Sequence, residues 1–302
     1  MRISGVDPQR ARTEAEAAVA SGVMTTNTDN ATMEKSLSGS DYNPLAHIAV
    51  WNEFSMSAAM YSYLAGYNDP RIGVYFQPAV KSGAFAGLRN GQSTTELNQA
   101  ENQPDANSQI GPGWVTRSGT GWLENPTRRQ EIMCCAEAYF LRAEGALNGW
   151  NMDGTPEDLY ETGIRMSMQQ WGITADSSID AYIHTDALPV PVPGAVSSAA
   201  VSSTPVKWAA DGNLQREQIG TQKWLALYPD GFEAWAEVRR SGFPVLYPVV
   251  HSDNPNLPAG TSIKRLPYPT VEAQTDAVEL AKGKALLGGP DNAATRLWWD
   301  VE

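Results

Sequence analysis

The residues best suited to chemistry in this chain are four aromatic side chains, Tyr75, Phe76, Trp114 and Trp122. They lie in residues 74–127, which are rich in Gly, Asn, Gln, Ser and Pro and show no helical or strand periodicity. A long loop-rich insert in a compact protein usually carries function. Flat aromatic rings stack on the apolar faces of sugar rings, while polar side chains bind the hydroxyl groups. We therefore predict that these four residues bind a ligand, with plain packing as the alternative.

Most of the other tryptophans have a simpler explanation. The chain contains 10 Trp and 6 Phe, and four of the tryptophans lie on or beside helical stripes, which favours a place in the core. These are Trp150, Trp171, Trp224 and Trp235. Trp298 and Trp299 are close to the end of the sequence, and we expect them to seal the packing there.

Catalytic signatures are absent from the sequence. It contains no Gly-x-Ser-x-Gly elbow, no phosphate-binding Gly-Lys loop and no His-Glu-x-x-His. A glycosidase needs only two carboxylates, so Asp69 and Glu124 are nominal candidates among 34 acidic residues. Turn chemistry in Asn-Asp-Pro explains Asp69 better. We predict no catalytic residue and no cofactor, and conclude that the protein is not an enzyme.

A metal site is left open by the sequence. The adjacent Cys134 and Cys135 cannot complete a four-ligand zinc site, and we expect them to be small core residues. The three histidines are far apart and lack metal-ligand spacing. Asp291, Asn292 and Asp300 could offer oxygens to calcium, although turn and cap roles explain them better.

The bulk composition limits the partners. The chain has 302 residues and a net charge of −12, which argues against nucleic acid because phosphate binding needs clustered Lys and Arg. It also argues against adsorption to an anionic lipid surface. No run of 18 apolar residues predicts a transmembrane helix, and the N-terminus lacks the pattern of a signal peptide and a lipid-acceptor cysteine.

Helices must position these residues. The pattern predicts helices from Pro8 to Gly22, over Ala49–Leu64, from Ile132 to Leu147, after Thr155 as far as Trp171, and from Thr270 to about Leu286. The third and fourth form an antiparallel hairpin of the tetratricopeptide type. Residues 218–242 predict two short helices separated by a Pro-Asp-Gly turn, with Gly242 as the stop. We expect Arg239 and Arg240 to pair with acids and helix-end carbonyls.

An ordered set of segments resembles the SusD/RagB family of bacterial outer-membrane glycan-binding lipoproteins. The most specific piece is Gln222-Lys223-Trp224 followed by Glu233-Ala234-Trp235-Ala236-Glu237 and Arg239-Arg240. The other pieces are Val6-Asp7-Pro8, Asp69-Pro70-Arg71, Ala136 to Glu144, Trp171-Gly172, Arg265 to Pro269, Gly288 to Asn292 and Trp298-Trp299-Asp300. Together they span nearly the whole chain.

The resemblance implies an all-α fold of tetratricopeptide-like helical hairpins with long loop-rich insertions. It implies that residues 1–302 form a single domain, the C-terminal portion of the family's fold. The expected function is non-catalytic binding of an oligosaccharide or polysaccharide at the bacterial surface, for delivery to a SusC-like, TonB-dependent transporter. The expected location is the outer membrane, through a lipid anchor absent from this chain. Family ligand sites vary in sequence, so the four aromatic residues are nominated from their own context.

Two alternatives remain from the sequence. The first is a tetratricopeptide-like scaffold that binds proteins and has no sugar ligand. The second is a glycoside hydrolase built on helices, which requires two carboxylates facing each other across a cleft. For the favoured hypothesis, we expect Trp114→Ala or Trp122→Ala to weaken glycan binding without unfolding the chain. The glycan itself is not specified, and glycopeptides are also possible ligands.

Overall fold

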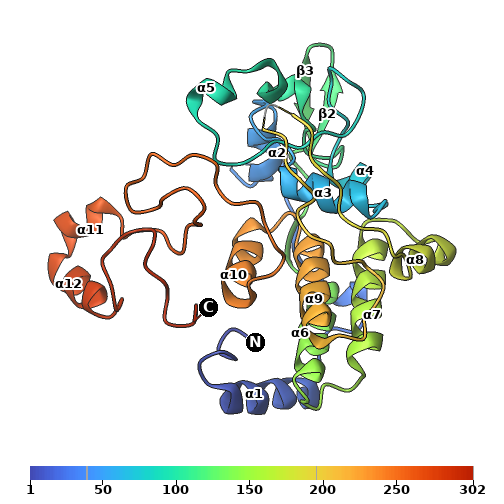
Figure 1. Ribbon diagram of the computed structural model, residues 1–302, viewed down its shortest axis with the longest axis vertical. Helices are drawn as coiled ribbons and strands as arrows, with labels where there is room; N and C mark the ends of the chain where they lie inside the picture. The colour runs from blue at the N-terminus through green and yellow to red at the C-terminus, as the bar shows by residue number, and fades with distance from the viewer. Residues whose placement is uncertain (39, 195, 302) are drawn as a thin grey trace.

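The computed structural model describes residues 1–38, 40–194 and 196–301 and is built around four packed helices. They are α6 (Cys135–Leu147), α7 (Pro156–Gln170), α9 (Gly212–Ala226) and α10 (Gly231–Ser241). Helices α6 and α7 form an antiparallel hairpin, α9 packs against both, and α10 packs on α9 (Figure 1).

The other helices and the strands surround these four helices. The helices are α1 (Pro8–Ser21), α2 (Pro44–Ala49), α3 (Ala58–Gly66), α4 (Ile72–Tyr75), α5 (Thr94–Leu97), α8 (Asp176–Ile183), α11 (Thr270–Thr275) and α12 (Ala277–Ala285). The strands are β1 (Ala31–Met33), β2 (Val115–Ser118), β3 (Gly121–Glu124) and β4 (Gln130–Met133), which pair antiparallel as β1–β4 and β2–β3. Because helices dominate and the strands are short, the predicted all-α class is confirmed. Within the described residues, no helix has the length and apolar character needed to span a bilayer.

The structure confirms several of the helix ends predicted from local sequence signals. The side chain of Asp7 accepts a hydrogen bond from the backbone N–H of Arg10 at the start of α1, as an N-cap does. Thr155 caps α7 in the same way. The predicted Pro-Asp-Gly break separates α9 from α10, and Gly242 ends α10 at φ +73°, where a residue without Cβ avoids strain.

Three predicted helices have different bounds. The expected helix over Ala49–Leu64 is two helices, because the chain turns at Asn52 with φ +59° and restarts where Ser57 caps α3. The predicted helix beginning at Ile132 starts later, since residues 130–133 pair with β1 as a strand. The last predicted helix is broken at Asp276, whose side chain caps α12.

Small residues at the α6–α7 crossing allow close packing, as the sequence indicated. The clearest is Gly163, where an added Cβ would lie 2.8 Å from the ring of Phe140, a fully buried side chain.

We expect Gly163→Ala to lower the free energy of unfolding by about 1–3 kcal/mol, because overpacking a rigid ring outweighs the gain in helix propensity. Gly73→Ala is the matched control, since it lies in α4 with no atom within 4 Å of its added Cβ. That control should be neutral or slightly stabilising. Urea unfolding of both variants measures the difference, and an equal effect at the two sites would contradict the packing argument.

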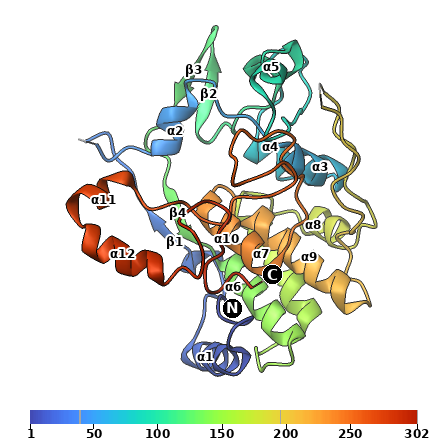
Figure 2. The same ribbon diagram turned by 60° about the vertical axis from the view of Figure 1, so that its left-hand side comes forward.

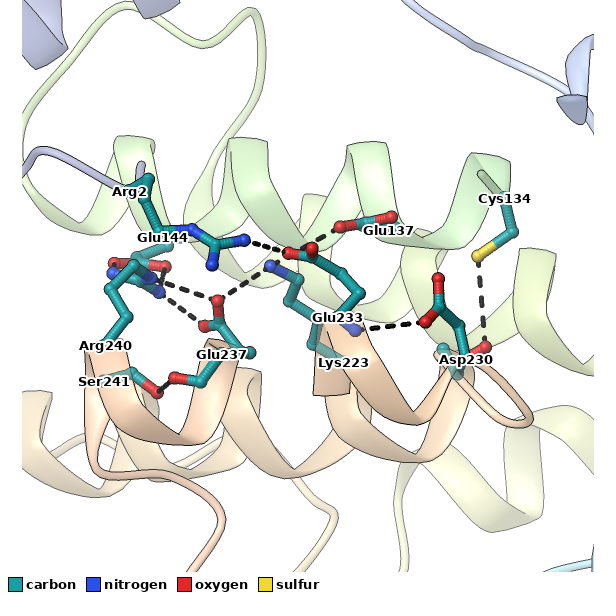
Figure 3. A network of polar contacts seen from close by, with 11 residues as sticks. Arg2, Cys134, Glu137, Glu144, Lys223, Asp230, Glu233, Glu237, Arg240 and Ser241 are labelled. Atoms are coloured by element: carbon teal, nitrogen blue, oxygen red, sulfur yellow. Dashed lines mark hydrogen bonds and ion pairs between the residues drawn. The ribbon is translucent and has the colours of Figure 1, made fainter. Parts of the chain in front are cut away.

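A buried ion network joins α6, α9 and α10 (Figure 3). The ammonium of Lys223 on α9 lies 3.0 Å from a carboxylate oxygen of Glu237 on α10 and 3.7 Å from Glu137 on α6. The guanidinium of Arg240 donates to Glu237 and, at 2.8 and 2.6 Å, to both oxygens of Glu144 on α6. The expected pairing of Arg240 with acids is therefore confirmed, and the network fixes three helices to one another.

Candidate functional site

The structure places two of the four nominated aromatic residues inside the core. Tyr75 is 0% exposed and Phe76 is 6% exposed. The Tyr75 ring stacks on that of Tyr228, with ring centroids 4.3 Å apart, and its hydroxyl donates to the carbonyl of Leu225. As the chain is folded here, a sugar ring cannot reach these two side chains. Both side chains pack in the core, which was the alternative to ligand binding, and we do not include them in the proposed site.

The two nominated tryptophans occupy different environments. Trp114 is 1% exposed and packs against Trp171, with the Arg128 guanidinium 4.9 Å from its ring centroid. Trp122 lies on β3, is half-buried, and has the guanidinium of Arg117 on the paired strand 5.2 Å from its ring. Replacing Trp114 by Ala would open a large core cavity costing about 3–5 kcal/mol. We therefore expect Trp114→Ala to destabilise the fold strongly, which differs from the expectation drawn from the sequence.

A group of aromatic and polar side chains gathers where α2 meets the β2–β3 hairpin, the two elements that lie together at the upper end of the molecule (Figure 2). We call this surface the α2 face and define it by Tyr42, His47, Trp51, Trp122 and Glu124. The rings of Tyr42 and His47 have centroids 4.5 Å apart, and those of His47 and Trp51 are 6.4 Å apart. Trp51 is 59% exposed.

The local sequence explains why these side chains meet. Asn43 accepts hydrogen bonds from the backbone N–H groups of Leu45 and Ala46, which starts α2 at Pro44. His47 and Trp51 are four residues apart, so they lie on the same side of this turn of chain. Trp122 and Glu124 are two residues apart on β3 and therefore share one face of the hairpin.

The α2 face combines flat rings with hydrogen-bonding groups. His47 Nδ1 lies 3.0 Å from Glu124 Oε2, which joins the helix to the hairpin and fixes the imidazole between Tyr42 and Trp51. The second Glu124 oxygen and the other imidazole nitrogen are free to bind hydroxyl groups, as no hydrogen bond within the described residues engages them. Such a surface can hold a polyhydroxylated ring by stacking and hydrogen bonding.

The sequence did not nominate Trp51 or His47, which the structure places on the α2 face. Trp51 follows the helical spacing of Met56 and Met60, so it read as part of an apolar stripe. The break at Asn52 removes it from that stripe and turns it to solvent. Another tryptophan was misplaced in the same way, because Trp298 was expected to seal the packing and is 67% exposed.

The residues considered for metal binding have other roles. Among the described residues, no three His, Cys, Asp or Glu side chains are grouped so that they could hold a metal ion. Burial raises the pKa of the Cys134 thiol to about 12, and that of Cys135 to about 11. Asp291 accepts hydrogen bonds from the Arg265 side chain and the Tyr268 backbone, and the Arg265 hydrogen bond is the main cause that lowers its pKa to about 2.

Comparison with known proteins gives one family. A family model described as SusD-like, Susd and RagB outer membrane lipoprotein, matches residues 1–300. No match was found among curated proteins.

Solved structures agree with this match over the whole chain. A chitin-binding SusD homolog from Flavobacterium johnsoniae is 35% identical, with a TM-score of 0.87 over 100% of this chain and 61% of its own. A SusD homolog from Bacteroides vulgatus is 32% identical, with a TM-score of 0.84 and coverages of 100% and 60%. A structure described as a chitin-binding protein is 27% identical, with a TM-score of 0.77 and coverages of 100% and 62%. This chain thus spans about three fifths of the length of these relatives.

Proposed function

Because the chain belongs to the SusD/RagB family of outer membrane lipoproteins, we propose that it captures oligosaccharides without cleaving them and delivers them to a SusC-like, TonB-dependent transporter. In this proposal the protein lies at the cell surface, held to the outer membrane by a lipid anchor. Weak, reversible capture suits delivery, since a ligand that must be passed on has to dissociate readily.

The observation that carries the proposal is the α2 face. Trp51 presents a large aromatic surface to solvent at the end of α2, the half-buried Trp122 lies on β3, and the His47–Glu124 pair joins the two elements and supplies polar atoms. A lone exposed ring marks no site, but aromatic rings grouped with polar side chains form the kind of surface that interaction sites use, and Tyr42, His47 and Trp51 are grouped in this way. Neutral sugars are compatible with the net charge of −12, which disfavours anions.

The ligand class follows from the relatives. Two of them are described as chitin-binding, so we propose chitin oligosaccharides as the first ligands to test. Their acetamido groups offer both a donor and an acceptor, which the His47–Glu124 pair can match.

We expect Trp51→Ala to weaken the binding of chitin hexamer by about tenfold, because losing one stacking ring costs on the order of 1–2 kcal/mol. Trp122→Ala should weaken binding too, with some loss of stability because the ring is half-buried. Isothermal titration calorimetry measures the affinities. Trp298→Ala is the matched control, since it removes an exposed tryptophan, 67% accessible, from another part of the chain.

Two results would contradict the proposal. Unchanged affinity in both Trp51→Ala and Trp122→Ala would remove the α2 face from the site. Release of reducing ends by the wild type during the titration would make the protein a hydrolase. Delivery is tested separately by co-purification with a SusC-like transporter, which we expect to retain the wild-type chain with its glycan.

A further inference from the structure

A pocket of about 260 Å³ lies between the start of α2, strand β4 and the start of α10. Its wall includes Pro44, Trp114, Gln130, Glu131, Asp230 and Phe232. This volume is below the roughly 300–1,000 Å³ of pockets that enclose drug-sized ligands. It therefore suits a single ring rather than a whole oligosaccharide. Trp114 forms part of its inner wall, which gives this nominated residue a place beside a ligand space.

Two apolar side chains are left uncovered at this pocket. Phe232, in the first turn of α10, is 77% exposed. Ile132 is 50% exposed, because the β1–β4 register shifts between Ala31 and Thr32 and leaves Ile132 with no residue opposite. A phenyl ring in water gains free energy when an apolar surface covers it. The apolar face of a sugar ring is one such surface.

Polar side chains in the pocket wall have hydrogen-bonding atoms without partners among the described residues. Within the described residues, no hydrogen bond engages the side-chain amide of Gln130, and Asp230 uses one oxygen, Oδ1, to cap the backbone N–H of Glu233. Glu131 receives Arg128 on one oxygen at 3.1 Å. An amide and two carboxylate oxygens beside an aromatic ring form the combination that binds sugar hydroxyls.

Helix α2 links the pocket to the α2 face, because its first residues line the pocket and His47 lies farther along it. Pro44, in the pocket wall, is three residues before His47, a spacing that places the two on one side of α2, and Trp51 follows two residues after the helix ends at Ala49. The six residues of α2 span about 9 Å along the axis. A ligand that places one ring in the pocket and also runs along this length to Trp51 therefore needs more than two sugar units.

We propose that this pocket is a second sugar subsite, in which Phe232 stacks on one ring of an oligosaccharide that runs along α2 to Trp51. The ligand of the α2 face is then an extended chain rather than a mono- or disaccharide. This inference rests on the proposed glycan-binding function and adds the length of the substrate and a contact from α10.

Calorimetry with chitin oligosaccharides of two to six units tests the subsite. We expect wild-type affinity to rise with length, and Phe232→Ser to weaken hexamer binding by about three- to tenfold while leaving dimer binding unchanged. Because Phe232 is exposed, the variant should unfold at the wild-type urea concentration. Leu286→Ser is the matched control, since it removes an 86% exposed apolar side chain from the end of α12.

The outcomes separate the two proposals. If the wild type binds hexamer and Trp51→Ala weakens it, but Phe232→Ser binds like the wild type, the subsite is wrong and the capture function stands. Equal wild-type affinity for dimer and hexamer also overturns the subsite. If the wild type binds none of the oligosaccharides, the proposed ligand class fails and the subsite with it. If Leu286→Ser weakens hexamer binding as much as Phe232→Ser, the effect is not local and the inference is overturned.

Discussion

Replacing Asp69 with Asn should lower the free energy of unfolding by about 3–5 kcal/mol, because it removes the charge partner of a fully buried arginine. Asp69 and Arg71 form an ion pair with Nη2 and Oδ2 2.6 Å apart, and both side chains are 0% exposed. The Nε of Arg71 also donates to Asp69 Oδ1 at 2.9 Å. A buried charge without its partner keeps its desolvation cost and loses the attraction that offsets it.

The surroundings of Arg71 add to the loss of stability expected for Asp69→Asn. Its guanidinium donates to Ser167 on α7 at 2.8 Å, to the hydroxyl of Tyr182 on α8 at 3.1 Å, and to Gln222 on α9 at 3.0 Å. Burial alone would lower the pKa of Arg71, but the Asp69 carboxylate outweighs it and the pKa lies above its ordinary value. Without Asp69 that support is lost, but a guanidinium is too basic to be deprotonated in a protein, so Arg71 stays charged and three helices converge on an unbalanced cation.

Asp153→Asn provides the matched control for this prediction. Asp153 also faces an arginine, with Arg142 Nη2 4.0 Å from its carboxylate, but its side chain is 87% exposed. Its backbone lies at φ +55°, a conformation that Asn tolerates. We expect a change within about 0.5 kcal/mol for this variant. Urea unfolding measures both, and a loss below 1 kcal/mol for Asp69→Asn would refute the role of the pair.

Local interactions could be predicted from the sequence, whereas interactions between distant residues could not. Helix ends were predictable because the signals are local: Asp7, Thr155 and Gly242 act within a few residues of their own positions. Asp69 read as turn chemistry, and its carboxylate does accept the backbone N–H of Arg71. The larger role depends on Gln222, which is 151 positions from Arg71 in the sequence. No spacing rule connects residues at that separation.

The candidate site also contains residues that the sequence could nominate and residues that only the folded structure reveals. Trp122 was nominated because it lies in a stretch without periodicity, where core packing does not explain a tryptophan, and its role in binding stays a prediction. Tyr75 was nominated from the same stretch, but it lies at the end of α4 and points into an aromatic core assembled from distant segments. Phe232 was read only as part of a turn and helix motif. Its exposure depends on how α10 meets β4, which only the folded chain reveals.

The ion network of α6, α9 and α10 should make the free energy of unfolding fall at acidic pH. Glu237→Gln should remove most of this pH dependence. Glu237 is 2% exposed. Burial would raise its pKa, but Lys223 and Arg240 outweigh burial and lower the pKa to about 2, from an ordinary value of 4.5. A depressed carboxyl pKa stabilises the fold above the unfolded value, and this stabilisation is lost as the pH falls from about 4.5 towards 2. Glu137 acts in the opposite sense, because burial raises its pKa.

At pH 7 we expect Glu237→Gln to lower the free energy of unfolding by about 3 kcal/mol, the equivalent of a pKa shift of more than two units. At pH 3 the gap to the wild type should narrow to about 1 kcal/mol, because the wild-type carboxylate is by then losing its advantage. Glu279→Gln, which removes a 61% exposed partner of Lys282, should change stability by less than about 0.5 kcal/mol at either pH. Urea unfolding at several pH values gives both curves. Parallel curves for the wild type and Glu237→Gln would show that the ionisation of this carboxyl does not hold the three helices together, whereas convergence towards acid assigns the effect to its charge.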